Sequence, residues 1–485
     1  MFVFDNTYAR LPERFYARVT PTPVREPRLF FANRPLAGRL GLDPEKLDAT
    51  VFAGNSVPPG AEPIALAYAG HQFGAFVSQL GDGRAILLGE VIGSDERRRD
   101  VQWKGTGRTP FSRGGDGRAA LGPVMREALV SEAMSALGVP TTRALAAVAT
   151  GERVFRDEPL PGAVLTRIAA SHIRVGTFEY FAARGDVDAL ATLTAYSLAR
   201  HYPEAGQGPL ALLDSVALAQ ADLVARWLAI GFVHGVMNTD NTAISGETID
   251  YGPCAFLDEY DPDKKFSSID HGGRYAFRNQ PRIALWNLAR LAEALAPLVA
   301  TVEGDPVRVL TEHLQRFGPR FEAAYTRALR DKLGLIREED GDRELAEEAL
   351  ALLASDAVDY TVFFRRLCDV AAGAPGPGAE PELVSLFRDP HEIREWLGRW
   401  RKRVAAEDVP PDERAGAMRR ANPAFIPRNH RVEEAIAAAV RRSDFGPFEV
   451  LMRVLARPYD DQPESAHLAD PPAEEQRVRQ TFCGT

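Results

Sequence analysis

The chain has 485 residues, 45% of them hydrophobic, and can bury one large core or roughly two to three ordinary ones. Its 58 lysines and arginines stand against 67 aspartates and glutamates, and the net charge of −9 gives no general attraction to nucleic acid phosphates. The first residues lack a basic and then apolar leader, and no stretch approaches the roughly 20 apolar residues of a membrane span. We expect a cytoplasmic monomer that binds neither nucleic acid nor membrane.

Changes in residue pattern divide the chain into four parts. Residues 1–60 are expected to form an N-terminal extension packed on the core, and residues 61–180 a β-rich lobe that binds nucleotide. Amphipathic periodicity dominates residues 181–455, which we expect to form a mainly α lobe with the catalytic and metal loops. Residues 456–485 are rich in proline and acidic residues and indicate an extended tail.

Short apolar runs and glycines mark the β-rich lobe. Between residues 63 and 91, Gly81-Asp82-Gly83 separates two apolar runs, as in a hairpin that could cover a nucleotide. A strand-like run then ends at Lys104 and a glycine-rich stretch follows. Apolar residues at helical spacing over 123–137 predict one helix, which carries Glu127.

The order of three charged residues in this lobe is typical of protein kinases. Lys104 comes 20 residues after Arg84, and Glu127 comes 23 residues after the lysine. Each residue alone is weak support, because a lysine after a strand is usually solvated. In a kinase, however, a strand lysine binds phosphate oxygens and a helix glutamate holds the lysine. The order therefore indicates a nucleotide site of this type.

The segment 231–253 is the most informative stretch. His234 opens a loop, Asn241 lies seven residues later, and Asp250-Tyr251-Gly252 is expected to close a short hairpin. Amide and carboxylate oxygens are ligands that Mg²⁺ takes beside substrate phosphates. Asn241 and Asp250 are therefore the predicted metal ligands.

One position departs from the kinase pattern H-R-D-x-x-x-x-N. His234 and Asn241 coincide with its ends, but Val236 occupies the place of the catalytic aspartate. Asp240, directly before Asn241, is the carboxylate that could replace it as a base. Such a displacement disfavours γ-phosphoryl transfer, because base, nucleophile and phosphorus must be nearly in line.

Arginines are abundant near the predicted nucleotide site. Arg84 follows the glycine turn, Arg113 and Arg118 flank a Gly-Gly-Asp-Gly run, and Arg167 and Arg174 follow the strands. Guanidinium groups suit phosphate oxygens, although any one of them could instead pair with a surface carboxylate. If the segment containing Arg167 and Arg174 is helical, their spacing is close to two turns and aims both to one side.

At these residues the sequence resembles the selenoprotein O family, also called the YdiU family, of protein adenylyltransferases with a pseudokinase fold. The resemblance covers nearly the whole chain. Its motifs are AYAGHQFGAF (67–76), LGDGRAILLGE (80–90), WKGTGRTPFSRGGDGRA (103–119), MREALVSEAMSALGVPTTRAL (125–145), HGVMNTDN (234–241), IDYGP (249–253) and NPAFIPRNH (422–430).

The resemblance implies an α+β, protein-kinase-like two-lobed fold with family-specific extensions. It implies that ATP binds in a flipped orientation with Mg²⁺ or Mn²⁺, so that AMP is transferred to Ser, Thr or Tyr of proteins, including this chain itself, and pyrophosphate leaves. Lys104 paired with Glu127, metal ligands Asn241 and Asp250, and the base Asp240 follow from it. The further nucleotide-binding residues that it implies are Gly81, Gly83, Arg84, Asp116, Gly117, Arg167, Arg174 and Asp250.

The resemblance also implies a redox role for the C-terminus, because family members carry selenocysteine or cysteine third from the end. Cys483 occupies that place, and Cys254 is the nearest candidate partner beside Asp250. We expect a Cys254–Cys483 disulfide, which an unchanged thiol count after mild oxidation would contradict. The residues alone favour three separate thiols.

Three other functions remain open at this point. The chain could be a protein or small-molecule kinase that uses Asp240 as a displaced base, or could transfer UMP from UTP with Mn²⁺. A nucleotide-binding regulator without turnover is less well supported, because a mere binder needs no metal ligands aimed at phosphate. His71 and His234, beside apolar residues or glycine, are interpreted as structural histidines.

Overall fold

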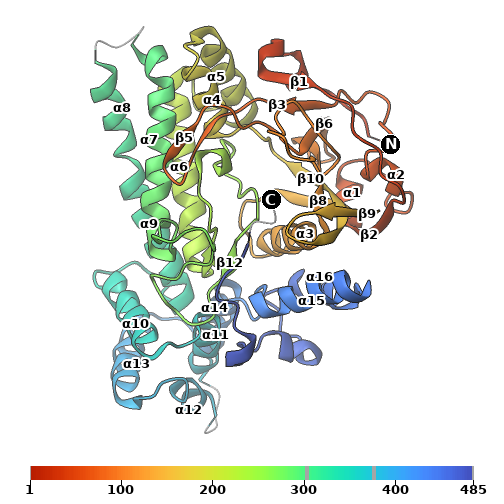
Figure 1. The fold of residues 1–485 in the computed structure, drawn as a ribbon. Helices are drawn as coiled ribbons and strands as arrows, with labels where there is room; N and C mark the ends of the chain where they lie inside the picture. Colours follow the sequence, from red (N-terminus) through yellow and green to blue (C-terminus); the bar gives the residue numbers. More distant parts are fainter. Residues whose placement is uncertain (1, 301–304, 374–377, 483–485) are drawn as a thin grey trace.

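Apolar strands in the first third of the chain build one antiparallel sheet, seen at the right of Figure 1. The computed structural model describes residues 2–300, 305–373 and 378–482. The sheet has eight strands in the order β1-β3-β6-β7-β10-β9-β2, with β8 paired to β10. Their bounds are β1 (Tyr16–Arg18), β2 (Arg28–Ala32), β3 (Ile64–Leu66), β6 (Ala85–Ile92), β7 (Arg98–Lys104), β8 (Ala119–Ala120), β9 (Arg143–Phe155) and β10 (Pro159–Ala169).

Residues 1–60, expected as an extension packed on the core, contribute directly to this sheet. They supply β1 and β2, which are the strands at its two opposite edges. The short helices α1 (Arg34–Arg39) and α2 (Ala49–Phe52) cover one face, where Trp103 is completely buried. The N-terminal segment thus closes both edges and one face of the sheet.

Helix α3 (Leu121–Ala136) packs on the other face, against β9 and β10. Pro123 lies in its first turn, as expected, and Gly138 follows its end with φ +78°. Glu127 is 5% exposed in the middle of this helix. The helix therefore holds one carboxylate inside the protein, beside the sheet.

The rest of the chain is mainly helical, so the mixed fold with a β-rich N-terminal and a helical C-terminal part is confirmed. Within this helical part, α6 packs against both α7 and α9. The helices are α4 (Val175–Ala182), α5 (Val187–His201), α6 (Pro209–Ala229), α7 (Gln280–Val299), α8 (Pro306–Leu314), α9 (Phe317–Leu333), α10 (Asp342–Asp356), α11 (Tyr360–Ala371), α12 (Ala379–Val384), α13 (Pro390–Ala405), α14 (Pro411–Ala421), α15 (Asn429–Arg442) and α16 (Gly446–Leu455).

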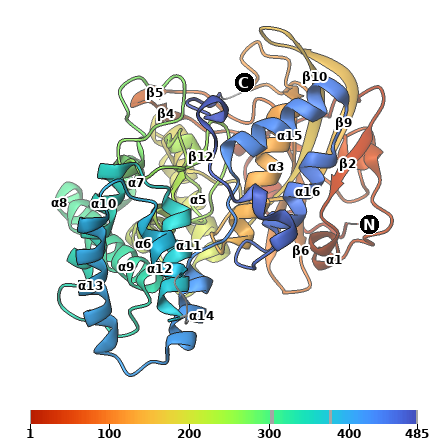
Figure 2. The same ribbon diagram turned by 90° about the horizontal axis from the view of Figure 1, so that it is seen from below.

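The last two helices return to the sheet region. Figure 2 shows α15 and α16 beside α3, and both pack against it. Arg126 on α3 forms an ion pair with Glu433 on α15. Beyond α16 the chain forms short 3-10 turns at Pro463–Leu468 and Glu474–Gln476 and is otherwise irregular. Within the described residues, no helix has the length and apolar content to cross a membrane.

The expected hairpin at Gly81-Asp82-Gly83 is wrong. The hairpin lies earlier, between β4 (Gly70–Gln72) and β5 (Ala75–Val77), and β6 pairs with β3 and β7 instead. Its turn contains Phe73 and Gly74, both with positive φ. The later turn bends differently because the Asp82 carboxylate accepts a hydrogen bond from Leu66 N at 3.1 Å.

Candidate active site

Asp250 is the centre of a group of buried charges between the sheet and the helices. Its Oδ1 accepts hydrogen bonds from Lys104 Nζ at 2.8 Å and Arg167 Nη1 at 2.6 Å. Its Oδ2 accepts one from Arg174 Nη1 at 2.8 Å. The residue has φ +63°, a region that only a supported non-glycine residue occupies. Three cations thus hold the carboxylate of a residue whose backbone has positive φ.

Glu127 completes this group from helix α3. Lys104 Nζ donates to Glu127 Oε2 at 2.6 Å, and Arg167 Nη1 donates to Glu127 Oε1 at 3.0 Å. Lys104 is the last residue of β7, so the strand and the helix meet at this pair. The side chains predicted to pair are therefore in contact.

Arg167 and Arg174 converge although the conditional expectation of a helix between them is wrong. Arg167 lies on strand β10, and Arg174 directly precedes α4. Both side chains are nearly inaccessible, at 2% and 3% exposure. Arg174 also lies over the ring of Tyr68, with Cζ 4.6 Å from its centroid.

These cations control the ionisation of Asp250. Burial opposes the charged form, but Lys104, Arg167 and Arg174 hold the pKa of Asp250 well below its usual range. Asp250 is therefore ionised at neutral pH. A site with this many cations can accept phosphate oxygens in exchange for carboxylate contacts.

Gln102, which the sequence did not suggest, holds Arg167 in place. Gln102 Oε1 accepts hydrogen bonds from Arg167 Nε at 3.1 Å and Nη2 at 2.6 Å. Gln102 Nε2 in turn donates to Asp82 Oδ2 at 3.3 Å, and burial raises the pKa of Asp82 to about 6. The strand period of two could have identified Gln102, because it places residues 102 and 104 on the same face of β7.

Asp240 lies beside this group. Its main-chain oxygen accepts a hydrogen bond from Arg174 Nη1 at 2.6 Å, and Gln72 Nε2 donates to its Oδ2 at 3.0 Å. Its Oδ1 is buried without a hydrogen-bond partner. Burial raises the pKa of Asp240 to about 6. A carboxylate of this kind is ionised at neutral pH and has one oxygen free to accept a proton.

Asn241 and Asp250 fit a divalent metal by the chemistry of their oxygens. Asn241 Nδ2 donates to Val236 O at 3.0 Å, which identifies its Oδ1 as the atom left for a ligand. Within the described ranges, no group of three or more His, Cys, Asp or Glu side chains could hold a metal ion. Substrate phosphates and water would therefore complete the coordination of Mg²⁺.

The remaining predicted nucleotide-binding residues lie in two glycine-containing loops. Ser112 Oγ donates to Gly83 O, which ties the turn before Arg84 to the loop 105–118. Asp116 in that loop pairs with Arg156 at 2.9 Å. Gly81 and Gly117 both have positive φ, and a Cβ at Gly117 would lie 2.0 Å from Gly107 O. Among the described residues, no hydrogen bond or ion pair joins these loops directly to Asp250.

The two histidines differ in their contacts. His234 is buried and its Nε2 donates to Ile249 O at 2.9 Å, while burial lowers its pKa. It thus supports the loop before Asp250, as a structural histidine does. His71 pairs with Glu179 on α4. The His71–Glu179 pair joins the β4–β5 hairpin to the helical region.

The predicted Cys254–Cys483 disulfide falls on Cys483, which lies outside the described residues. Cys254 is buried next to Pro253. The tail reaches this place, because Thr481 Oγ1 donates to Pro253 O at 2.6 Å and Thr481 N donates to Phe266 O at 2.7 Å. Residues 253 and 481, far apart in sequence, are thus neighbours.

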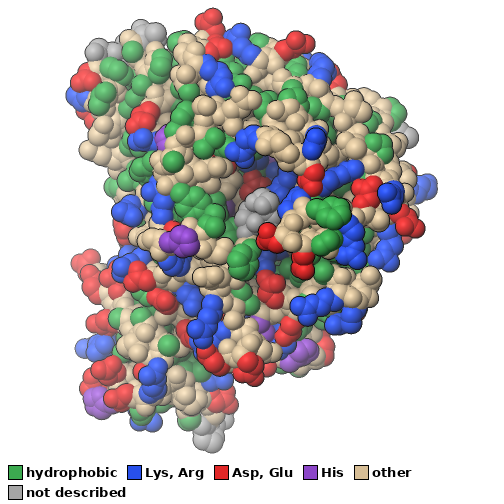
Figure 3. Space-filling model, in the orientation of Figure 1, with side chains coloured by type: hydrophobic (Ala, Val, Ile, Leu, Met, Phe, Trp, Pro, Cys, Tyr) green, Lys and Arg blue, Asp and Glu red, His purple; other side chains and the backbone are tan. Residues whose placement is uncertain are grey.

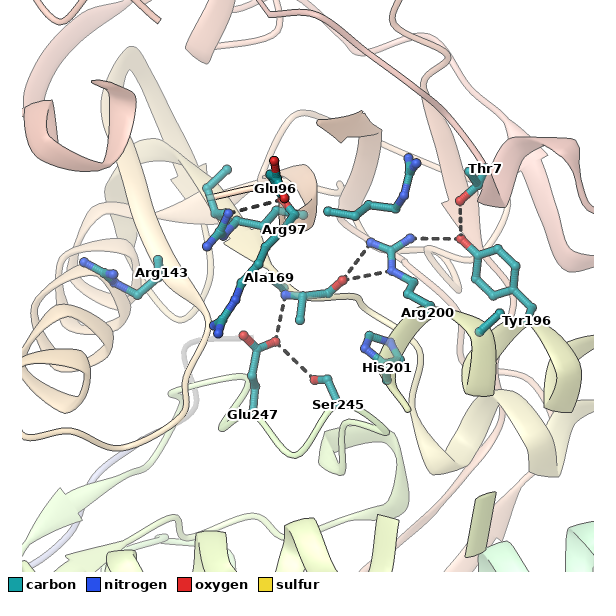
Figure 4. A pocket seen from close by; sticks show the side chains of 15 residues that line it. Thr7, Glu96, Arg97, Arg143, Ala169, Tyr196, Arg200, His201, Ser245 and Glu247 are labelled. Carbon is teal, nitrogen blue, oxygen red and sulfur yellow. Dashed lines mark hydrogen bonds between the residues drawn. The ribbon is translucent and has the colours of Figure 1, made fainter. Parts of the chain in front are cut away.

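A cavity of about 850 Å³ lies beside strand β10 and helix α5 (Figure 4). Arg200 Nη2 donates to Ala170 O at 2.7 Å, and Glu247 Oε2 accepts from Ala170 N at 2.8 Å. Burial raises the pKa of Glu247 to about 7. Arg200 and Glu247 thus hold the main chain at Ala170, between β10 and Arg174. We interpret them as residues that support the position of Arg174.

Comparison with known proteins agrees with the chemistry of this site. The model of a family described as Protein adenylyltransferase SelO matches residues 2–456. A protein named protein nucleotidyltransferase YdiU from Rhizobium meliloti (strain 1021) is 59% identical over 490 residues, covering 100% of this chain and 99% of the relative. Proteins of the same name from Rhodopseudomonas palustris (strain BisB5) and Bradyrhizobium sp. (strain ORS 278) are 60% and 58% identical, with the same coverage.

These matches define the class of the enzyme as a nucleotidyltransferase. The chain belongs to the SelO family, as the resemblance of its motifs indicated.

Proposed function

We propose that this nucleotidyltransferase transfers AMP from ATP to Ser, Thr or Tyr hydroxyls of proteins, in a site with a protein-kinase-like fold. The observation that carries the proposal is the position of the carboxylates. Asp250 is surrounded by Lys104, Arg167 and Arg174, while the buried carboxylate beside it comes from Asp240 and not from position 236.

The surplus of cations suits a triphosphate whose far end is buried. A kinase that transfers the γ-phosphoryl group must leave that group at the mouth of the site. Arg167 and Arg174 are both almost completely buried, so phosphates bound to them lie inside the protein. This favours a flipped ATP, with its β- and γ-phosphates inside and its α-phosphate toward the acceptor.

In the proposed reaction the acceptor hydroxyl oxygen forms a bond to the α-phosphorus. The bond from that phosphorus to the bridging oxygen breaks, and pyrophosphate leaves. Asp240 takes the hydroxyl proton, and Arg167 and Arg174 stabilise the charge that develops on pyrophosphate. Mg²⁺ or Mn²⁺, held by Asn241 and Asp250, would neutralise phosphate charge.

ATP labelled separately at its α- and γ-phosphates tests this proposal. The enzyme is mixed with Mg²⁺ and a heat-treated protein extract, whose own kinases and transferases are inactive, and label on protein is measured. We expect α-label on protein and no γ-label. Protein that carries only γ-label would contradict AMP transfer and identify a kinase with a displaced base. The same measurement with α-labelled UTP and Mn²⁺ distinguishes UMP transfer.

A further inference from the structure

The β4–β5 hairpin presents two exposed phenylalanines close to the proposed base. Phe73 is 36% exposed and Phe76 is 43% exposed. The ring of His71 lies 5.0 Å from Phe76 and 5.3 Å from Trp286 on α7, so the hairpin and the helix share one aromatic surface. We name Phe73, Phe76 and Trp286 the aromatic lip.

Hydrogen bonds fix the lip relative to Asp240. Gln72, the residue before Phe73, donates from Nε2 to Asp240 Oδ2 at 3.0 Å. The main-chain N of Phe73 donates to Asn238 Oδ1 at 3.1 Å, two residues before Asp240. An acceptor whose hydroxyl reaches Asp240 therefore has its neighbouring residues close to Phe73.

The lip has a positively charged border. Arg274 and Arg290 lie over Trp286, with Cζ 4.6 Å and 4.8 Å from its ring centroid. Arg290 pairs with the exposed Glu293. In the part of the chain that the structure describes, Arg274 makes no ion pair with a carboxylate. Its charge thus remains available to a partner, whereas the protein as a whole carries a charge of −9.

We infer that the aromatic lip and Arg274 bind the acceptor polypeptide, an inference that rests on the proposed function. The lip would select an apolar side chain near the modified hydroxyl, and Arg274 would select a carboxylate near it. Exposed aromatic rings give contact area at little cost in side-chain entropy, and buried aromatic and arginine contacts dominate binding energy. A polypeptide satisfies both features at once, since it presents apolar and acidic side chains at fixed separations along the chain.

Short synthetic peptides test the inference. Each contains one threonine, and a phenylalanine and an aspartate are moved one position at a time relative to it. Parallel sets carry serine in place of the phenylalanine, or lysine in place of the aspartate. We expect at least one arrangement to be labelled by α-labelled ATP with kcat/KM about tenfold above its serine and lysine versions.

Variants assign that selectivity to the lip. Phe73→Ala should remove the preference for phenylalanine, and Arg274→Gln the preference for aspartate, while ATP affinity stays as in the wild type. Phe155→Ala, which removes a phenylalanine that is 71% exposed at the end of β9, is the matched control and should keep both preferences.

Three outcomes would overturn the inference. Equal labelling of all peptides by the wild type would do so, as would preferences that survive in Phe73→Ala and Arg274→Gln. Competition by a single-stranded oligonucleotide but not by the favoured peptide would assign the lip to nucleic acid instead. A separate failure is possible: the wild type could bind ATP but label neither peptides nor extract proteins. That result would refute AMP transfer itself, and the labelling experiment with extract proteins detects it independently of the peptides.

Discussion

Each charge near Asp250 is stable in the interior because of its neighbours. A buried ion without a partner costs several kcal/mol, so cations and carboxylates must be brought together in matched sets. Lys104, Arg167 and Arg174 face Asp250 and Glu127, and the group retains a net positive charge. This residual charge is what a polyphosphate would neutralise, since phosphate oxygens accept the same hydrogen bonds as a carboxylate.

Replacing Gln102 by Leu tests how far this arrangement depends on residues that do not touch the nucleotide. Gln102→Leu leaves Arg167 Nε and Nη2 without their acceptor, a cost of about 1–3 kcal/mol for each buried group. We expect kcat/KM for ATP to fall about tenfold or more, measured as AMP transfer. Gln207→Leu, an exposed position, is the control and should retain wild-type kinetics. Unchanged kinetics in Gln102→Leu would show that Arg167 needs no support.

At the scale of elements, the β4–β5 hairpin connects the sheet region with the helices. It follows β3 of the sheet, yet its contacts are with α4 and the loop before Asp240. Figure 3 shows the surface hollowed between the two regions. The hairpin thus packs directly against the loop that carries Asp240.

Gly176, in the first turn of α4, packs closely against the main chain just before the β4–β5 hairpin. Ala69 N donates to Gly176 O at 2.9 Å, and a Cβ at Gly176 would lie 2.1 Å from Ala69 O. Gly176→Ala must displace the hairpin, so we expect a loss of about 1–3 kcal/mol in stability and slower AMP transfer. Gly318→Ala, where a Cβ meets no atom within 4 Å, should leave both unchanged or raise stability slightly. Chemical denaturation measures the difference, and equal curves for Gly176→Ala and wild type would contradict the contact.

The sequence predicts the arrangement of the sheet region better than the contacts between regions. Lys104 and Glu127 follow from strand and helix periodicity and from their order along the chain. Gln72 could not be found in this way, because it contacts Asp240 across 168 residues and no local pattern records that contact. The sequence favours a hairpin at Gly81-Asp82-Gly83, which is wrong, because glycines indicate a turn but do not specify which strands pair.

At the scale of the whole molecule, the helical region contains a buried lysine far in sequence from the active site. Lys332 on α9 is 2% exposed, and its Nζ lies 4.1 Å and 4.9 Å from the ring centroids of Phe364 and Tyr360. Burial lowers its pKa to about 7. The unfolded chain, where a lysine pKa is about 10.4, binds more protons above pH 7.

Stability should therefore rise with pH above about 7, by up to about 1.4 kcal/mol per pH unit from this residue. Lys332→Met should remove this contribution between about pH 7 and pH 8.5, where chemical denaturation measures the free energy of unfolding. Lys402→Met, at an exposed position of α13, is the control and should keep the wild-type slope. An equal pH dependence in Lys332→Met and wild type would mean that Lys332 stays charged in the folded state.

The proposed reaction attaches AMP, and not phosphate, to protein. The most direct measurement is the intact mass of the purified protein and of a generic acceptor protein after incubation with ATP and Mg²⁺. We expect a gain equal to AMP on at least one of them. The gain should be absent in Asp250→Ala and present in Asp412→Ala, which changes an exposed carboxylate of α14. A gain equal to phosphate, or an AMP gain that persists in Asp250→Ala, would contradict the proposed reaction.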